Sequence, residues 1–139
     1  MTGEGPIAYD FAVLRAVPHV HLGAFVPVGV VLHARTAGYL GMRTLVALDE
    51  LRARVPDVDH ELLARYLASG RAVAAGDPAG GPVALAPPSE RFHWLTAPRS
   101  DVLQSSPVHA GLTDDPARAL DELFAAYVLG AAAGRPRED

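Results

Sequence analysis

FVPVGVVLHARTAGYLGMRTLVA, residues 25–47, is the stretch that decides the fold. Its first part, residues 25–35, favours β-structure more strongly than any other run in the chain, because aliphatic residues alternate along one face. That face consists of Val26, Val28, Val30 and Leu32. Residues 36–38 form a short turn, and residues 39–47 predict a second strand. A connection of about three residues is too short for a parallel crossover, so the sequence predicts an antiparallel hairpin.

Pro27 and Gly29 interrupt the first strand of this hairpin. Proline cannot donate a hydrogen bond to a β-ladder, and glycine leaves a gap in the side-chain face. We therefore expect an edge position or a β-bulge near the beginning of this strand.

Upstream of the hairpin, residues 7–18 alternate with a period of two, which predicts a further strand and extends the hairpin to an antiparallel meander. Tyr9, Phe11 and Val13 lie on the aromatic side of this strand, and Arg15 is the one charge there. An arginine on such a face either reaches the edge of the sheet or meets a carboxylate or an anionic ligand. The edge position is the favoured alternative, because strands often carry one such charge.

Two longer helices are predicted downstream. The first runs to about Ala75, with an aspartate at position 57 or 59 as its N-cap and Gly76 as its end. The second runs from Pro116 to about Gly130, because an Asp-Asp-Pro sequence is typical of a capped helix start.

Four shorter elements are also predicted, one before the first long helix and three between the two. A helical turn is predicted at residues 48–55, and residues 83–86 form a candidate edge strand within a loop rich in Gly and Pro. Ser89 is expected to cap a short helix at residues 90–96, and residues 101–106 predict a fourth strand.

These elements predict an α+β fold, an antiparallel sheet of about four strands with two main helices packed on one face. The chain has 139 residues, half of them hydrophobic, and can bury a core as one domain over residues 1–139. An ordered core is expected over about residues 7–130, with loose termini.

Composition excludes several classes of function. The chain has no Cys, which excludes disulfides, thiolate nucleophiles and thiolate zinc sites. The net charge is -4 and the twelve basic residues, all Arg, are dispersed, so the electrostatic footprint of a nucleic-acid-binding protein is missing. No signal peptide and no apolar run of roughly 20 residues is present, so a cytoplasmic location without membrane association is expected.

Residues 89–112 read SERFHWLTAPRSDVLQSSPVHAGL and concentrate the polar side chains that could carry chemistry. Such a segment must either place its polar groups in a cleft or satisfy each of them by hydrogen bonds inside the fold. The candidate residues for ligand or partner binding, which include the only Trp, are Arg91, Trp94, Arg99, Gln104, Ser106 and His109.

Three functions remain open for this segment. We favour binding without chemistry, in which an Arg, Gln and His cluster beside Trp94 takes an anionic ligand or a protein partner. The alternative is a small hydrolase or transferase, with Ser105 or Ser106 as nucleophile, His109 as base and the arginines as an anion clamp. No nucleophile elbow, phosphate loop or triad spacing supports that alternative. A structural homodimer is the third possibility.

His19 and His21 share one face if their segment is extended, and such a pair can begin a metal site. No further histidine or carboxylate follows at ligand spacing, and two ligands bind a metal weakly. We therefore expect neither a metal nor another cofactor.

Three sequence blocks resemble the bacterial family catalogued as domain of unknown function 3037. They are YDFAVLRAVP, GAFVPVGVVL, and above all RFHWLTAPRSDVLQSSPVHAGL with the D-P-x-x-A-L-x-x-L-F helix that follows it. The resemblance spans about residues 9–129. It implies a small cytoplasmic protein without an assigned reaction. Some members are encoded beside a HipA-like kinase, which implies a possible protein partner.

Overall fold

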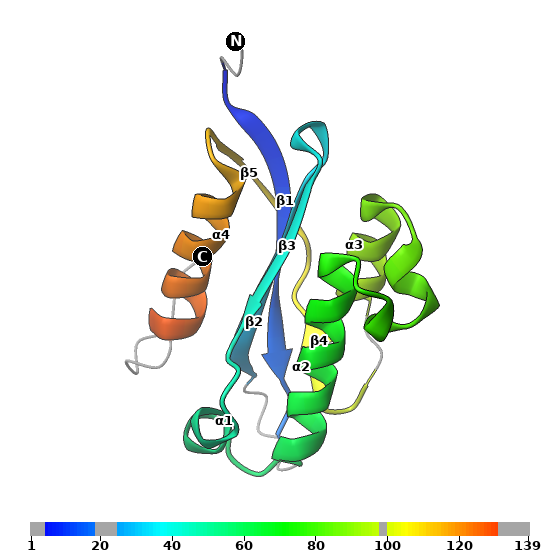
Figure 1. The fold of residues 1–139 in the computed structure, drawn as a ribbon. Helices are drawn as coiled ribbons and strands as arrows, with labels where there is room; N and C mark the ends of the chain where they lie inside the picture. The colour runs from blue at the N-terminus through cyan, green and yellow to red at the C-terminus, as the bar shows by residue number, and fades with distance from the viewer. Residues whose placement is uncertain (1–4, 19–24, 98–99, 131–139) are drawn as a thin grey trace.

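The computed structural model describes residues 5–18, 25–97 and 100–130. Its five strands are β1 (Ile7–Ala16), β2 (Val26–Ala34), β3 (Tyr39–Thr44), β4 (Leu103–Ser105) and β5 (His109–Thr113). They form an open antiparallel sheet in the order β3, β2, β1, and both β4 and β5 pair with the other edge of β1 (Figure 1). The predicted α+β class is confirmed, with five strands instead of about four.

The predicted hairpin is formed by β2 and β3. The two strands pair antiparallel, with Ala34 opposite Tyr39, and a short 3-10 helix at Arg35–Ala37 makes the turn. Gly38 follows this turn with φ of 63°, a left-handed conformation that glycine adopts without steric cost. The hairpin prediction is therefore confirmed.

A β-bulge interrupts the pairing of β1 with β2. Up to Gly29 the strands pair residue by residue, but beyond it Arg15 lies opposite Pro27, and Val28 is left as the extra residue on β2. The bulge expected from Pro27 and Gly29 is confirmed. Near this end of β1 the guanidinium carbon of Arg15 lies 4.5 Å from the ring centroid of Phe25. Its Nη2 donates to the carbonyl of Ser105 at 3.5 Å, whereas its Nε is buried without a hydrogen-bond partner, and no described carboxylate pairs with it.

Together, β4 and β5 form one interrupted edge strand. Pro107 separates them, because its backbone has no N–H to donate. Ser106 bridges the gap: its backbone N–H donates to the carbonyl of Val13 at 2.8 Å, and its Oγ accepts from the N–H of Val13 at 2.9 Å. β4 lies where the fourth strand was predicted. β5 was not predicted, because its half-exposed residues lack the alternation of a buried strand.

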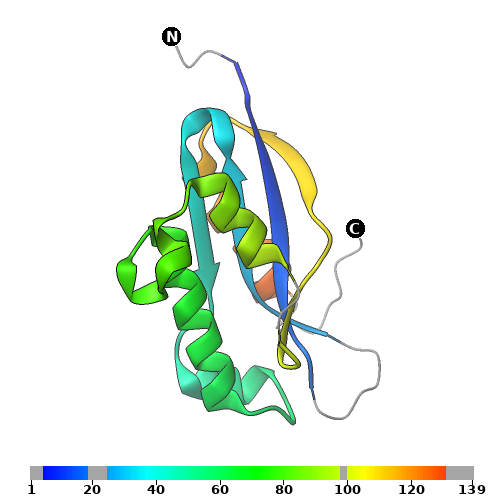
Figure 2. The same ribbon diagram turned by 90° about the vertical axis from the view of Figure 1, so that its right-hand side faces the viewer.

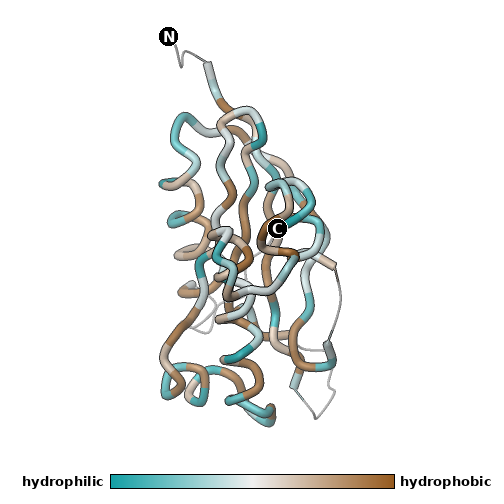
Figure 3. The backbone as a smooth tube through the Cα atoms, turned by 45° about the vertical axis from the view of Figure 1, so that its right-hand side comes forward, coloured by the Kyte–Doolittle hydropathy of each residue, from teal (hydrophilic) through white to brown (hydrophobic). Residues whose placement is uncertain are grey.

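Four helices surround the sheet: α1 (Leu48–Arg54), α2 (His60–Ala75), α3 (Pro88–Thr96) and α4 (Pro116–Phe124), the last continuing as a π-helical segment at Ala125–Leu129. In two views at right angles, α4 lies on one side of the sheet and α2 with α3 on the other (Figures 1 and 2). Apolar stretches follow the central strands, whereas polar and apolar residues alternate along the helices (Figure 3).

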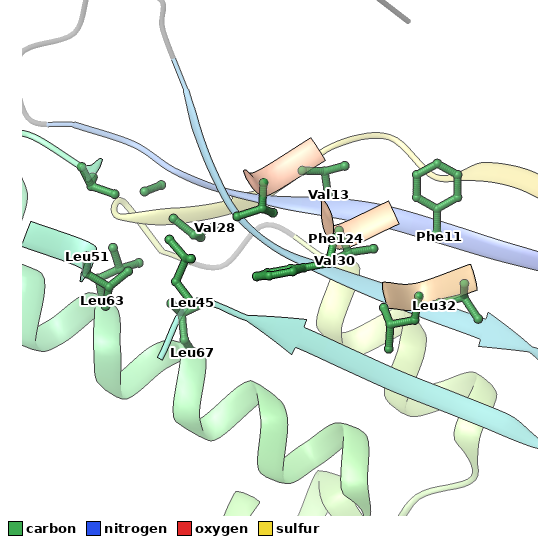
Figure 4. Packing of buried hydrophobic residues seen from close by; sticks show 14 of the residues in the cluster. Phe11, Val13, Val28, Val30, Leu32, Leu45, Leu51, Leu63, Leu67 and Phe124 are labelled. Atoms are coloured by element: carbon green, nitrogen blue, oxygen red, sulfur yellow. The ribbon is translucent and has the colours of Figure 1, made fainter. Parts of the chain in front are cut away.

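Buried side chains form two clusters, and α2 contributes to both, with Leu63 and Leu67 in the first and Val73 and Ala74 in the second. On one face, Phe11 and Val30 pack against Phe124 from the α4 side (Figure 4). On the opposite face, Leu14 and Val31 pack with the end of α2 and with α3. The two main helices, expected on one face, lie on opposite sides of the sheet in Figures 1 and 2, although the first half of α2 shares a cluster with Phe124. The physical reason is that the middle of β1 and nearly all of β2 are buried on both sides, so each face needs a cover.

The helix caps follow the sequence signals in most places. Asp59 caps α2 by accepting from the N–H of Leu62, and Gly76 ends it in a left-handed conformation with φ of 73°. The start of α3 differs, because the helix begins at Pro88, so Ser89 lies inside its first turn and is not the cap. Residues 83–86 also differ: instead of an edge strand, the 3-10 helix Pro82–Leu85 occupies this segment, and Ala86 is its C-cap.

We predict that Phe124→Ala lowers the free energy of unfolding by about 3–5 kcal/mol, because Phe124 is only 4% exposed and joins α4 to the sheet. Leu129→Ala is the matched control: this side chain is 40% exposed, and its loss should cost about 0.5 kcal/mol or less. Urea unfolding measures both. Equal losses would contradict the assignment of α4 as the cover of this face.

Candidate functional site

A small hollow lies between α2, α3 and the β1–β4 edge, and we call it the tryptophan hollow. Its volume is about 190 Å³. Its larger apolar lining residues are Leu14, Met42, Tyr66, Trp94, Leu95 and Leu103. Its polar lining residues are Ser69, Ser100, Gln104 and Ser105. The hollow is therefore mainly apolar and carries hydroxyl and amide groups as its polar component.

Gly70 allows α2 to come close to the sheet at this hollow. A Cβ atom added there would lie 2.8 Å from Cε of Met42 and 3.5 Å from Cδ2 of Leu95. The first distance is shorter than van der Waals contact permits, so a larger residue would force the end of the Met42 side chain to move. Gly70 therefore has a packing role against Met42 and Leu95.

The structure brings two of the proposed binding residues, Trp94 and Gln104, into the tryptophan hollow. Ser105, named for the catalytic alternative, also lines it. Trp94 comes from α3, and Gln104 and Ser105 come from β4. These two elements, which are neighbours in the chain, meet Leu14 of β1 and Tyr66 of α2 at one solvent-reachable site.

Arg91 is engaged elsewhere. Its Nη1 donates to the carbonyls of Val73 and Ala74 at 3.0 and 2.9 Å, and its Nε donates to the carbonyl of Ala86 at 2.9 Å. Those carbonyls include two near the C-terminal end of α2, where helical partners are missing. Arg91 therefore joins α3 to the end of α2 through backbone carbonyls, and these bonds occupy it in the described structure.

Ser106 and His109 lie along the edge strand. The Oγ of Ser106 donates to the carbonyl of Pro107 at 2.8 Å, and the Oγ of Ser105 donates to the carbonyl of Ser106 at 2.7 Å. His109 is exposed, and its ring lies 5.4 Å from that of Phe11. Within the described residues no hydrogen bond joins either serine to His109, so the structure offers the Ser–His arrangement no support.

The remaining candidates lie outside the described residues. These are Arg99, proposed for anion binding, and the pair His19 and His21, considered for a metal. Among the residues that are described, no group of three or more His, Cys, Asp or Glu side chains could hold a metal ion.

A second, more polar hollow opens on the same face of the sheet, and we call it the histidine hollow. It has a volume of about 470 Å³. Its polar lining residues are Asp10, His33, Arg35, Thr36, Ser89 and His93. Sequence reasoning missed this site because Asp10 and His33 become neighbours only through the β1–β2 register, which places them opposite each other. His33 in an otherwise apolar strand was the one available signal.

His33 lies at the buried base of the histidine hollow. It is 7% exposed, and its ring centroid lies 5.4 Å from that of Phe92. Burial lowers the pKa of His33, Asp10 raises it, and Arg35 and Arg91 lower it further, with a net decrease below its usual value. The imidazole is therefore kept neutral at pH 7.

We predict that Ser106→Ala lowers the free energy of unfolding by about 1–3 kcal/mol, because the backbone N–H of Val13 loses its acceptor. Amide hydrogen exchange at Val13 should accelerate by more than the general loss of stability explains. Ser105→Ala is the control, since that hydroxyl bonds only to the adjacent carbonyl of Ser106. Unchanged exchange at Val13 would contradict the bridging role.

We predict that stability falls as the pH drops below about 6.5, the ordinary pKa of histidine. Because the pKa of His33 is lower in the folded state, the unfolded chain binds more protons in that window, so unfolding becomes easier on acidification. Above the window this contribution is fully present. Urea unfolding at several pH values, with His33→Gln to subtract the other groups, measures the effect. An identical pH dependence in the variant would refute it.

Comparison with known proteins gives one match. The model of the family described as "Protein of unknown function (DUF3037)" matches residues 11–128. No curated protein and no solved structure matches the chain. In the portion of the chain that the structure describes, no helix has the length and apolar character to cross a bilayer.

Proposed function

The chain belongs to the DUF3037 family of proteins of unknown function, and we propose that it is a binding module whose tryptophan hollow receives an apolar side chain of a protein partner. The observation that carries this proposal is the mainly apolar hollow itself, lined by the only Trp together with hydroxyl and amide groups. Pockets that anchor protein partners combine these features, an apolar base for one side chain and polar groups around it.

The size of the tryptophan hollow favours a side chain over a whole small molecule. Sites for small ligands usually measure about 300–1,000 Å³. At about 190 Å³ the hollow is smaller than that range. One inserted aliphatic or aromatic side chain therefore suits it better than a cofactor.

A further hollow adjoins it along α3. Trp94 and Ala97 line both. The further hollow is also lined by Val83, Ser89, Glu90 and His93, of which Ser89 and His93 line the histidine hollow as well. Two depressions that share one tryptophan as their common wall form a longer contact surface than a single ligand group needs. This continuity supports a segment of another protein as the occupant.

The identity of the partner is proposed from the family resemblance. A HipA-like kinase, of the kind encoded beside some members of the family, is the first protein to test. Anion recognition by this module would have to use Arg99, because Arg91 already donates to three backbone carbonyls. The enzymatic alternative gains no comparable observation, since the hydroxyls of Ser105 and Ser106 are bonded to the backbone.

We predict that Ser69→Leu blocks the hollow. Ser69 is exposed on α2 and lines the hollow, whereas its neighbour Ala68 is exposed but does not line it. Trp94 fluorescence should respond saturably to N-acetyl-leucinamide with a Kd on the order of 10 mM, because burying one aliphatic side chain supplies about 1.5–3 kcal/mol. Ser69→Leu should weaken this binding about five-fold or more, and Ala68→Leu should leave it unchanged.

N-acetylglycinamide, which has no side chain, should give no saturable response. The same two variants then test the partner: purified HipA-like kinase should be retained by the Ala68→Leu protein and lost by the Ser69→Leu protein. A response to N-acetyl-leucinamide that is equal in both variants would refute the tryptophan hollow as the binding site. Kinase binding that is equal in both would refute that partner at this site.

A further inference from the structure

The histidine hollow contains two side chains of opposite charge that form no salt bridge with described residues. Asp10 and Arg35 both line it, and no salt bridge joins them to each other or to another described residue. Both side chains are exposed. Elsewhere on the surface, arginines such as Arg43 and Arg118 pair with nearby aspartates. An unpaired carboxylate and guanidinium in one hollow are complementary to a ligand that carries both charges.

The base of the hollow is a buried polar group. His33 is 7% exposed and stacks near Phe92, and no hydrogen bond to its ring is formed by the residues that the structure describes. A buried imidazole without such a bond has a donor and an acceptor available. Since it lines the hollow, these groups are available to a bound molecule.

The N-terminus of α3 adds backbone donors on the same side. The helix has nine residues, and its N-cap, Pro87, provides no side-chain acceptor. The N–H of Arg91 donates to the carbonyl of Pro87, so the preceding amides of Ser89 and Glu90 come before the first helical bond. Ser89 itself lines the hollow. Free amides at a helix start attract a carboxylate.

From these observations we propose that the histidine hollow binds a small zwitterion of the α-amino acid type. Its carboxylate lies toward Arg35 and the start of α3, and its ammonium group lies toward Asp10. Alanines at positions 8 and 110 with the ring of Tyr9 supply apolar walls for a side chain. At about 470 Å³ the hollow is within the range of sites for small molecules.

A simpler ligand fits the same residues less well. A plain anion would meet the repulsion of Asp10, and a plain cation would meet that of Arg35. A metal ion lacks ligands, because no cluster of three suitable side chains exists among the described residues. A neutral His33 adds no charge that would change this balance. A ligand that carries both charges can form a favourable interaction with Asp10 and with Arg35 at the same time.

The experiment uses the whole chain, labelled with ¹⁵N in its histidines, at pH 7.5. The probes are leucine, 4-methylpentanoate, which lacks the ammonium group, and 3-methylbutylamine, which lacks the carboxylate. The imidazole signal of His33, assigned with His33→Gln, reports binding at this hollow. We expect a saturable shift with leucine and an affinity about ten-fold higher than for either half-ligand, because each half-ligand lacks one of the two charge-assisted hydrogen bonds.

Two variants test the charges. Asp10→Asn and Arg35→Gln should each reduce the affinity for leucine about ten-fold, whereas Arg118→Gln, which changes an arginine paired with Asp114, should not. Ser69→Leu should also leave this binding intact, since it blocks only the tryptophan hollow. The proposal is overturned if leucine causes no saturable shift of the His33 signal. It is also overturned if 4-methylpentanoate binds as tightly as leucine, or if Asp10→Asn strengthens binding, because either result identifies a plain anion site.

Discussion

The arrangement of both hollows depends on the hydrogen bonds that the guanidinium of Arg91 donates to backbone carbonyls. The guanidinium donates to carbonyls near the end of α2 and in the segment before α3, where a helix has carbonyls without partners and a partial negative charge. Charge-assisted bonds of this kind are stronger than neutral ones. Because α3 contributes Trp94 to one hollow and Ser89 with His93 to the other, fixing α3 against α2 sets the geometry of both.

Local chemistry explains which parts of the fold could be predicted from the sequence. Asp59 and Gly76 mark the ends of α2 because a cap and a left-handed residue are local requirements, and Pro27 with Gly29 predicted the bulge for the same reason. The side of the sheet on which each helix packs is a tertiary property. The alternation along β1 suggested that only one face of the sheet is covered. In the structure the middle residues of β1 are buried on both faces.

The candidate site likewise has parts that could be predicted from the sequence and parts that could not. A single Trp near polar residues indicated a hollow, and Trp94 and Gln104 do meet in one. The role of Arg91 could not be predicted, because its partners are backbone carbonyls, which every residue has. The sequence does not show that Asp10 lies opposite His33, because this depends on the register of β1 and β2. A shift of the register by one residue would turn the side chains of one strand to the other face of the sheet.

The interruption at Pro107 also bears on how the molecule behaves when it is concentrated. An uncovered sheet edge can template the addition of a strand from another copy, and long flat edges therefore promote aggregation. Here the outer strand is divided into pieces of three and five residues by a residue that has no N–H to offer. Ser106 turns its own hydroxyl inward to Val13, so the break does not weaken the inner ladder. The edge thus discourages the addition of strands from other copies, while the N–H and carbonyl of Val13 beneath the break both remain bonded.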